Sequence, residues 1–197
     1  MCLLLETIRV QDGRYCHLRY HQTRVDRTMG MLFPEASPVN LGMIPIPDHA
    51  RTGIVKCRIV YDREIQTIDF LPYFPKAILS LKLVRAESLE YQFKYLDRSV
   101  IEQLLADHKD YDEIILVKNG CITDSSYSNL AFRAGEDWYT PDEPLLRGTC
   151  RQRLIEAGIL HPVKIRPEDV YQYSHVSLIN AMLDLEDMTL PIQSIKS

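Results

Sequence analysis

The sequence lacks several features that would place it in well-known protein classes. No apolar run is long enough to span a bilayer, and the opening segment MCLLLETIRV is too short and too soon charged for a signal peptide. The five cysteines form no CxxC pair and do not stand at zinc-finger spacing from a histidine. A net charge of −4 and a pI near 5.9 argue against a general nucleic-acid binder. These absences predict a cytoplasmic protein without a metal, a membrane or a nucleic-acid partner.

The bulk composition is that of an ordinary soluble globular protein. Apolar residues make up 46% and charged residues 25% of the 197-residue chain, which is long enough for one domain or two small ones. In the first half, β-branched and aromatic segments separated by tight turns predict antiparallel hairpins with one main helix. The expected elements are a hairpin opened by strand 3–10 and an Asp-Gly turn, a helix over 18–33, a hairpin over 53–73 and a strand over 77–86.

The second half mixes helices with further strands. Capping-box patterns begin each of two expected helices, namely Ser99 with Glu102 and Thr149 with Gln152. Segment 112–124 reads as a strand, an Asn-Gly turn and a return strand, and later strands continue the meander. The sequence therefore predicts an α+β fold in two halves.

The segment YQFKYLDRS places one lysine between two aromatic residues, just ahead of a helix start. Such a lysine, here Lys94, is ordinarily a surface residue with a buried stem and a hydrated head. The alternative is a catalytic amine. Support for that alternative has to come from the rest of the chain.

Other positions are compatible with parts of a phosphate-bearing cofactor site. The helix start at 148–151 offers backbone N–H groups and the positive end of the helix dipole, although a plain helix cap has the same pattern. Arg24 is either a counter-charge for phosphate or one more solvated arginine. Asp124 is either a turn residue beside a serine cluster or a carboxylate facing a protonated ring nitrogen. A lysine, a carboxylate and a phosphate-binding helix end are the parts that a pyridoxal-phosphate site needs.

Four stretches connect these positions, and their order matches that of a known family. They are LLETIRVQDGRYCHLRYHQTRV, FKYLDR, VKNGCITDSSYSNLAF and LLRGTCRQRLIE. The first resembles F-E-T-x-R-V followed by H-x-x-R-L, and the second resembles the segment around a Schiff-base lysine. The third resembles N-G-x-(I/V)-T-E-x-x-x-x-N-L-F, and the fourth L-x-G-I-T-R-x-x-(V/L)-I-E. Over nearly its whole length the chain thus resembles the class IV aminotransferases, which are fold-type-IV pyridoxal-phosphate enzymes.

This resemblance implies roles for individual residues. Lys94 would be the Schiff-base lysine, Arg24 a phosphate ligand, and Asp124 would stand where the family has a pyridine-facing glutamate. The aromatic neighbours of Lys94 would shape the pocket wall. Further cofactor contacts, made to phosphate through backbone N–H groups, would come from the helix start and from the SLINAM segment, which resembles a family N-S-L-M segment: Gly148, Thr149, Cys150, Asn180 and Ala181.

The resemblance also implies the architecture of the chain. Residues 1–88 would form a small N-terminal subdomain, an antiparallel sheet with a helix that is truncated relative to the family. Residues 89–197 would form a larger, α/β-barrel-like subdomain that binds the cofactor, and the local pattern places the boundary near residues 86–91. Pyridoxal 5'-phosphate would lie in the cleft between the two. Because family sites have the partner subunit close by, we expect a homodimer.

The K-Y-L-D-R pattern indicates the subgroup, because it is more like a lyase pattern than the K-x-x-x-N-Y of the aminotransferases. The expected reaction converts 4-amino-4-deoxychorismate, a small-molecule substrate, to 4-aminobenzoate and pyruvate in folate biosynthesis. Arg9, Arg58 and Arg147 are candidates for binding substrate carboxylates, because carboxylates favour arginine forks. Three alternatives stay open: a branched-chain or D-amino-acid aminotransferase, a non-catalytic truncated relative that binds only the cofactor or a partner, and an unrelated α+β domain.

Overall fold

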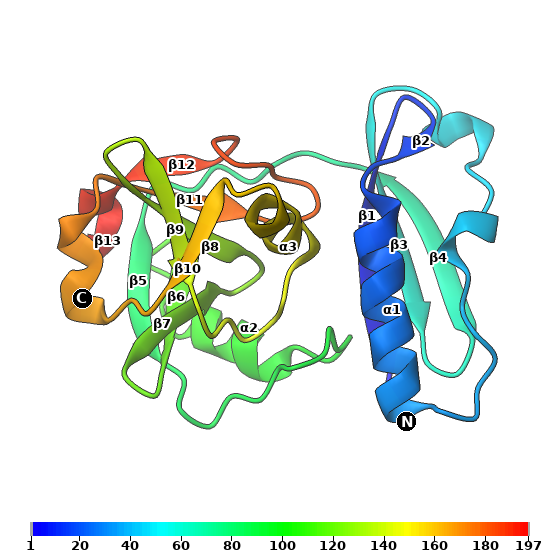
Figure 1. The fold of residues 1–197 in the computed structure, drawn as a ribbon, viewed down its shortest axis with the longest axis horizontal. Coiled ribbons are helices and arrows are strands. Elements are labelled where there is room, and N and C mark those ends of the chain that lie inside the picture. Colours follow the sequence, from blue (N-terminus) through cyan, green and yellow to red (C-terminus); the bar gives the residue numbers. More distant parts are fainter. Residues whose placement is uncertain (1, 197) are drawn as a thin grey trace. The chain divides into compact units, whose positions relative to one another are not determined.

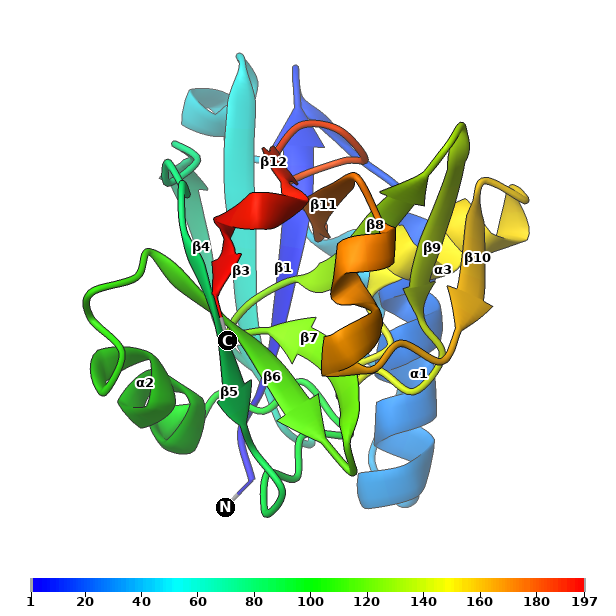
Figure 2. The ribbon, with the colours of Figure 1, turned by 90° about the vertical axis from the view of Figure 1, so that its left-hand side faces the viewer.

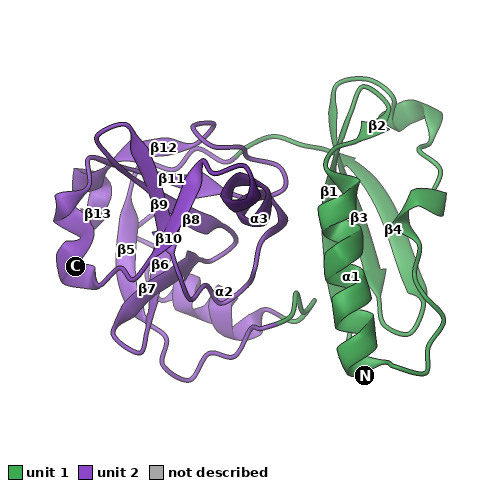
Figure 3. Cartoon of the chain, viewed as in Figure 1, with its two compact units in different colours: residues 1–75, 93–97 green, residues 76–92, 98–197 purple. Residues whose placement is uncertain are grey.

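The computed structural model describes residues 2–196 and divides into two compact units, shown in Figure 3. The small unit comprises the chain up to Pro75 together with Phe93–Asp97, and the larger unit comprises Lys76–Gln92 and the chain from Arg98 on. The chain therefore passes from one unit to the other three times. Within the described residues, no helix is both long and apolar enough to cross a membrane.

The small unit is a four-stranded antiparallel sheet with one long helix. Its elements are β1 (Leu4–Gln11), β2 (Arg14–Tyr15), α1 (Leu18–Leu32), the 3-10 helices η1 (Leu41–Met43) and η2 (Asp48–Ala50), β3 (Ile54–Tyr61) and β4 (Ile65–Pro72). The strand order is β2-β1-β3-β4, and α1 lies along one face of the sheet (Figure 1). Asp12 and Gly13 turn the first hairpin with positive φ angles of 48° and 73°, which confirms the predicted Asp-Gly turn.

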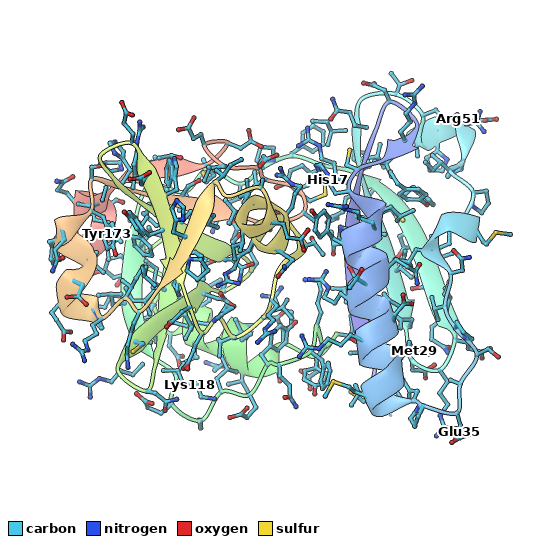
Figure 4. The ribbon with its side chains drawn as sticks, in the orientation of Figure 1. His17, Met29, Glu35, Arg51, Lys118 and Tyr173 are labelled. Atoms are coloured by element: carbon cyan, nitrogen blue, oxygen red, sulfur yellow. The ribbon has the colours of Figure 1, made fainter. Side chains whose placement is uncertain are left out.

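Strand β1 alternates between buried and half-buried side chains, as a strand with one covered face must. Its covered face packs against Val25 and Met29 of α1, and Met29 is labelled in Figure 4. Leu4 and Ile8 are apolar members of this face. Glu6 stands between them and is completely buried, so the alternation places a carboxylate inside an otherwise apolar core.

The larger unit is built on a nine-stranded mixed sheet, which is strongly curved in Figure 2. Its elements are β5 (Leu81–Arg85), α2 (Ser99–Ala106), β6 (Glu113–Lys118), β7 (Cys121–Ser125), β8 (Asn129–Ala134), β9 (Asp137–Pro141), α3 (Thr149–Glu156), β10 (Leu160–Val163), η3 (Pro167–Gln172), β11 (His175–Ile179), β12 (Thr189–Pro191), η4 (Ile192–Ser194) and β13 (Ile195–Lys196). The main order is β10-β9-β8-β7-β6-β5-β13, with β11 paired to β8 and β12. A small antiparallel sheet and a larger mixed one confirm the predicted α+β class.

Two local features of the larger unit position the residues described below. Asn119 and Gly120 turn β6 into β7 with φ angles of 52° and 69°, which confirms the predicted Asn-Gly turn. Helix α3 begins at Thr149 with Gly148 as its N-cap, and no side-chain hydrogen bond caps it. The predicted Thr149–Gln152 capping box is therefore wrong, because the helix starts at Thr149, one residue earlier than that box requires.

Other expectations about the fold also need correction. Helix α2 has Arg98 as its N-cap, without a side-chain cap, so the predicted Ser99 box is also displaced by one residue. The strand predicted over 77–86 does not extend the N-terminal antiparallel sheet. Its observed counterpart, β5, pairs in parallel with β6 and β13, because the buried apolar strand β6 offers it a partner in the larger sheet.

The two compact units divide the chain differently from the expected boundary near 86–91. Residues 76–88 group with the larger unit, because β5 belongs to its sheet. Residues 93–97 group with the small unit, because an isolated antiparallel bridge joins Leu4 to Tyr95. Pairing between distant strands, and not the order of the sequence, decides where each segment lies.

Candidate functional site

Lys94 lies in a short segment that pairs with the beginning of β1. The backbone N–H of Leu5 donates to the carbonyl of Lys94 at 2.9 Å. The N–H of Tyr95 donates back to the carbonyl of Phe93, also at 2.9 Å, which makes Lys94 the central residue of a tight three-residue turn. The two aromatic neighbours of Lys94, Phe93 and Tyr95, are two residues apart, a spacing that places side chains on one side of an extended chain.

Those two aromatic rings pack into the core of the small unit. Phe93 is a buried member of that core, Tyr95 packs against it, and the rings meet edge to face with centroids 5.9 Å apart. In the structure these rings anchor the turn that contains Lys94. That they also shape the wall of a cofactor pocket stays a prediction.

Glu6 joins β1 to α1 through a cluster of three polar side chains. Its carboxylate receives hydrogen bonds from Arg24 Nε to Oε1 and from Arg24 Nη2 to Oε2, both at 2.7 Å. His21 Nδ1 lies 2.6 Å from Oε2 of the same carboxylate. The two-pronged contact fixes the plane of the Arg24 guanidinium, whose side chain remains 14% exposed.

The charges in this cluster depend on one another. Burial raises the pKa of Glu6, but the charge of Arg24 and the hydrogen bonds from His21 and Arg24 outweigh it and lower that pKa to about 2. Burial also lowers the pKa of His21, and the positive charges of Arg24 and Lys94 act in the same direction. His21 is therefore a neutral donor at Nδ1, and Lys94 carries its charge near this cluster. The small unit thus brings Lys94 and Arg24, both predicted site residues, into one neighbourhood.

Asp124 lies near the end of β7 in the larger unit and is only 6% exposed. Its Oδ1 receives a hydrogen bond from Asn129 Nδ2 at 2.8 Å, and its Oδ2 receives one from the N–H of Leu146 at 2.9 Å. Both donors are neutral. The charge of Arg151 also acts on Asp124, but its guanidinium is hydrogen bonded to β9, at Thr140 Oγ1 and the carbonyl of Pro141.

The electrostatic state of Asp124 follows from this environment. Burial raises its pKa to about 7, and the hydrogen bonds from Leu146 and Asn129, together with the charge of Arg151, only partly oppose that shift. A carboxyl group of this kind takes up a proton near neutrality unless a cation lies beside it. A protonated ring nitrogen is a cation of the right kind, so the environment fits the role expected for Asp124.

The start of α3 lies close to Asp124 through Asn129. A Cβ atom added to Gly148 would lie 1.9 Å from Oδ1 of Asn129, so only glycine fits at this helix cap. Because no side chain caps α3, its first N–H groups can serve an anion. Thr149 is buried at this start, as expected for a residue that contributes through its backbone.

The side chain of Cys150 points to other partners. Its sulfur lies 3.8 Å from Asp184 Oδ1 and 3.6 Å from Arg153 Nη2, and burial raises its pKa to about 12. The thiol is therefore a neutral group at the base of α3. Any contribution of Cys150 to phosphate binding rests on its backbone N–H.

The SLINAM segment places Asn180 and Ala181 directly after β11. The Asn180 side chain is engaged within the unit: Nδ2 donates to Ser128 Oγ, and Oδ1 accepts from the N–H groups of Met182 and Leu183. The N–H of Asn180 donates to the carbonyl of Leu183 at 2.9 Å. Asn180 thus shapes the turn that holds Ala181.

The three candidate arginines for substrate binding lie on different elements, and their role stays a prediction. Arg9 lies on the face of β1 opposite to Glu6, and its Nε is buried without a hydrogen-bond partner among the described residues. Arg58, on the neighbouring strand, pairs with Asp69 at 3.5 Å. Arg147 is exposed in the connection that leads to α3.

The larger unit also contains a pocket of about 230 Å³ near the β6–β7 turn. Lys118, labelled in Figure 4, lines it and donates to Glu90 at 2.6 Å and to the carbonyl of Leu89 at 2.7 Å. Thr123 and Leu145 also line it, next in sequence to Asp124 and Leu146. The pocket therefore lies beside the segments that hold Asp124.

Three residues of the site were not among the predicted ones: Glu6, His21 and Asn129. The signal for Glu6 was readable, because an acidic residue at an inward position of an alternating strand needs a cation partner. His21 stands one helical turn before Arg24, on the same face of α1. Asn129 stands at the N of the N-L-F motif quoted above, which marks its position but not its contacts, because its partners come together through the pairing of β7 with β8 and the path of the chain to α3.

Comparison with protein-family models gives one match, in which residues 49–195 match the class IV amino-transferase family. A Haemophilus influenzae protein (strain Rd), described only as uncharacterized, is 36% identical over 182 residues, which are 91% of this chain and 97% of that protein. Each of these matches covers most of the chain.

Solved structures also resemble the chain. A protein from Haemophilus somnus 129PT, provisionally described as a 4-amino-4-deoxychorismate lyase, is 34% identical with a TM-score of 0.87, and the match covers 94% of this chain and 98% of that one. A hypothetical aminotransferase from Mycobacterium tuberculosis, in its pyridoxal-phosphate-bound form, is 18% identical with a TM-score of 0.73, covering 98% of this chain and 81% of that one. At that identity the second likeness shows the fold alone.

Proposed function

The chain belongs to the class IV amino-transferase family, and on that premise we propose that it is a pyridoxal-phosphate-dependent lyase that converts 4-amino-4-deoxychorismate to 4-aminobenzoate and pyruvate. The observation that carries this proposal is the identity with the Haemophilus somnus protein, which extends over nearly the whole of both chains. The lyase-like K-Y-L-D-R pattern around Lys94 supports it.

A pyridoxal-phosphate site needs an amine, a carboxylate and groups that bind an anion, and the chain contains a candidate for each. Lys94 Nζ is the amine that would hold the cofactor's aldehyde, and Asp124, whose hydrogen-bond donors are neutral, would hold the ring nitrogen's proton. The uncapped start of α3, from Gly148 on, and the Arg24 guanidinium, oriented by Glu6, would bind the phosphate.

When bound, the cofactor supplies an electron sink for the bond electrons that the substrate releases on losing its ring proton. Asp124 keeps that sink effective by retaining its own negative charge beside the ring nitrogen. Lys94 Nζ would take the proton from the ring carbon next to the substrate's amine. It then returns a proton to the enolpyruvyl side, so that pyruvate leaves as the ring becomes aromatic. No second substrate enters, because the atoms of 4-aminobenzoate and pyruvate together equal those of the substrate.

Pyruvate release provides the direct test of this proposal. Purified protein with bound cofactor is given 4-amino-4-deoxychorismate without any 2-oxo acid, and pyruvate is followed by a coupled assay. We expect turnover, and we expect Lys94→Ala to abolish it, because both the anchoring amine and the proton carrier are lost. Lys164→Ala, which removes an exposed lysine elsewhere in the larger unit, is the matched control and should leave turnover unchanged.

Two other outcomes would reassign the protein. Bleaching of the cofactor's absorption by leucine, isoleucine or D-alanine alone, with no pyruvate from 4-amino-4-deoxychorismate, would place it among the aminotransferases. Silence in both assays with cofactor bound would indicate a non-catalytic relative. Borohydride reduction and peptide mapping should place the pyridoxyl group on Lys94, and a label on another lysine would refute its role.

The proposal includes a homodimer. Phe74 is 84% exposed and Leu79 is 79% exposed, and large apolar side chains gathered in one segment favour a surface that another chain covers. Light scattering should give about twice the 22.9 kDa of one chain. A monomer with full cofactor occupancy would contradict this part of the proposal.

A further inference from the structure

Asn129 closes a small ring of hydrogen bonds around Asp124. Its Nδ2 donates to Asp124 Oδ1 and to the carbonyl of Leu146, both at 2.8 Å. The N–H of Leu146 in turn donates to Asp124 Oδ2 at 2.9 Å. Both protons of the Asn129 amide are therefore used, and both oxygens of Asp124 are held. This ring of hydrogen bonds holds the Asp124 carboxylate in one orientation.

The other end of the same amide meets the start of α3. Oδ1 of Asn129 occupies the place where a side chain on Gly148 would begin, since a Cβ there would lie 1.9 Å away. Leu146, which Asn129 holds through its carbonyl, stands two residues before Gly148. One side chain, 6% exposed, thus contacts both the carboxylate and the helix cap.

We propose that Asn129 is a positioning residue that holds the Asp124 carboxylate in a set geometry to the first N–H groups of α3, so that the ring nitrogen and the phosphate of one cofactor molecule are bound together. The inference rests on the proposed function only in taking pyridoxal phosphate as the molecule bound. It does not depend on the reaction catalysed. Asn129 itself touches neither the substrate nor the reacting atoms.

The cofactor has two ends, and binding measurements can address each. Pyridoxal carries the ring without the phosphate, and inorganic phosphate carries the anion without the ring. A residue that positions both Asp124 and the helix start must affect both ligands. A residue that merely stabilises the larger unit affects the melting temperature and leaves both binding constants as they are.

The experiment compares Asn129→Leu and Asn129→Ser with a matched control in the full chain stripped of cofactor. The control is Thr123→Val, at the residue just before Asp124. It removes a buried hydrogen bond from Thr123 Oγ1 to the carbonyl of Leu116. Dissociation constants are measured for pyridoxal phosphate, pyridoxal and inorganic phosphate. We expect both Asn129 variants to weaken the binding of pyridoxal and of phosphate by about tenfold each. Pyridoxal binding suffers because the hydrogen bond to the Asp124 carboxylate is lost, and phosphate binding suffers because the helix cap moves. The dissociation constants of Thr123→Val should stay within about twofold of those of the wild type.

The pH titration of the bound cofactor's absorption supplies a second readout. In the Asn129 variants its midpoint should shift, because the carboxylate beside the ring nitrogen is no longer held, and in Thr123→Val it should not. Binding constants and midpoints like those of Thr123→Val, at an equally lowered melting temperature, would overturn the inference. Weakening of only one of the two part-ligands would overturn the claim that Asn129 joins the two ends.

Gly148→Ala changes the other partner of the contact between Asn129 and Gly148. It replaces the Asn129 variants in the experiment if those do not fold. Its new methyl group would displace the Asn129 amide, so binding of pyridoxal, which has no phosphate, should weaken by about tenfold although the change is at the helix cap. Unchanged pyridoxal binding would refute the link. A wild type that binds pyridoxal phosphate and releases no pyruvate defeats the lyase proposal and leaves this inference standing. A wild type that binds neither pyridoxal phosphate nor its two parts defeats both.

Discussion

Each unit buries a carboxylate beside one or more of its candidate site residues, and the pKa values of the two carboxylates are shifted in opposite directions. Glu6 in the small unit is completely buried and has its pKa lowered to about 2. Asp124 in the larger unit is 6% exposed and has its pKa raised to about 7. Burial raises the pKa in both cases, so burial alone does not explain the difference.

The difference lies in the partners. Glu6 has a cation, Arg24, in two-pronged contact, and a neutral histidine that donates a third hydrogen bond. Among the residues that the structure describes, the donors in contact with Asp124 are neutral groups, including those of Asn129 and Leu146. Hydrogen bonds from neutral groups therefore do not offset the cost of burying the Asp124 charge, whereas a directly bound guanidinium does so for Glu6.

We infer from this contrast that the charge of Glu6 is structural, because Arg24 completes it within the small unit. For Asp124 we infer a functional charge, because the described residues place no cation in contact with it and a protonated cofactor ring would supply one. Each carboxylate should therefore respond to neutralisation in its own way.

The largest effect on stability is expected for Glu6→Gln. The substitution leaves the Arg24 charge without its partner in a nearly buried position, so the free energy of unfolding should fall by about 3–5 kcal/mol. Urea denaturation of the cofactor-free protein at pH 7 measures the loss. Asp69→Asn is the matched control, because its pair with Arg58 in the same sheet is half exposed and should change stability by no more than about 1 kcal/mol. Equal losses in both variants would contradict the special role of Glu6.

Asp124→Asn should instead raise the free energy of unfolding at neutral and higher pH. The raised pKa means that the protonated carboxyl favours the folded state, and this contribution is complete below the ordinary value of 3.8 and is lost as pH rises through about 7. The three-unit shift corresponds to roughly 4 kcal/mol across that window. Asp124→Asn has no such group to titrate. Between pH 4 and pH 8, the free energy of unfolding of the cofactor-free wild type should therefore fall by roughly 4 kcal/mol relative to that of the variant.

Taking the difference between wild type and Asp124→Asn removes the contributions of other groups that titrate in this window. His21 is the main one, since its lowered pKa makes stability rise with pH through its unfolded value. A flat difference curve would show that Asp124 is an ordinary carboxylate. Added pyridoxal phosphate should flatten the curve of the wild type, because the ring cation then stabilises the charged form.

Acid should act mainly on the small unit. The lowered pKa of Glu6 means that its charge stabilises the fold above the ordinary value of 4.5, and this contribution is lost as pH falls through about 2. The shift corresponds to roughly 3 kcal/mol. Wild type should therefore lose stability relative to Glu6→Gln by that amount between pH 5 and pH 2, as measured by denaturation curves. A difference that develops instead between pH 5 and pH 8 would contradict the assignment.

The sequence indicates one of these carboxylates better than the other. The strand alternation in LLETIRV places Glu6 on the inner face, and the period of α1 places His21 and Arg24 one turn apart, so local patterns suffice to predict that cluster in outline. The position of Asp124 was predicted from its resemblance to a family motif, but its environment was not. Asn129 lies only five residues on, across the turn from β7 to β8, but Leu146 comes from the approach to α3, and a contact between segments that distant in sequence has no local signature.

The same limit explains the errors in the fold. Turns such as Asp12-Gly13 and Asn119-Gly120 were predictable, because a two-residue hairpin needs residues that tolerate positive φ. The placement of β5 was not, because a short apolar strand is compatible with either sheet, and its pairing with β6 decides the matter. The bridge that ties Tyr95 to β1, and so Lys94 to the small unit, is equally non-local.

The smallest effect is expected at His21, and it tests how much a neutral donor contributes when a cation is also present. His21→Phe removes the hydrogen bond to Glu6, so the free energy of unfolding at pH 7 should fall by about 1.5–3 kcal/mol. His21→Asn can present an amide N–H near the position of Nδ1 and should recover most of this loss. In both variants Arg24 still binds Glu6, so the acid transition of Glu6 should stay below pH 4.5. If His21→Phe moved that transition above pH 4.5, the neutral donor would outweigh the cation, and the contrast between Glu6 and Asp124 would need another cause.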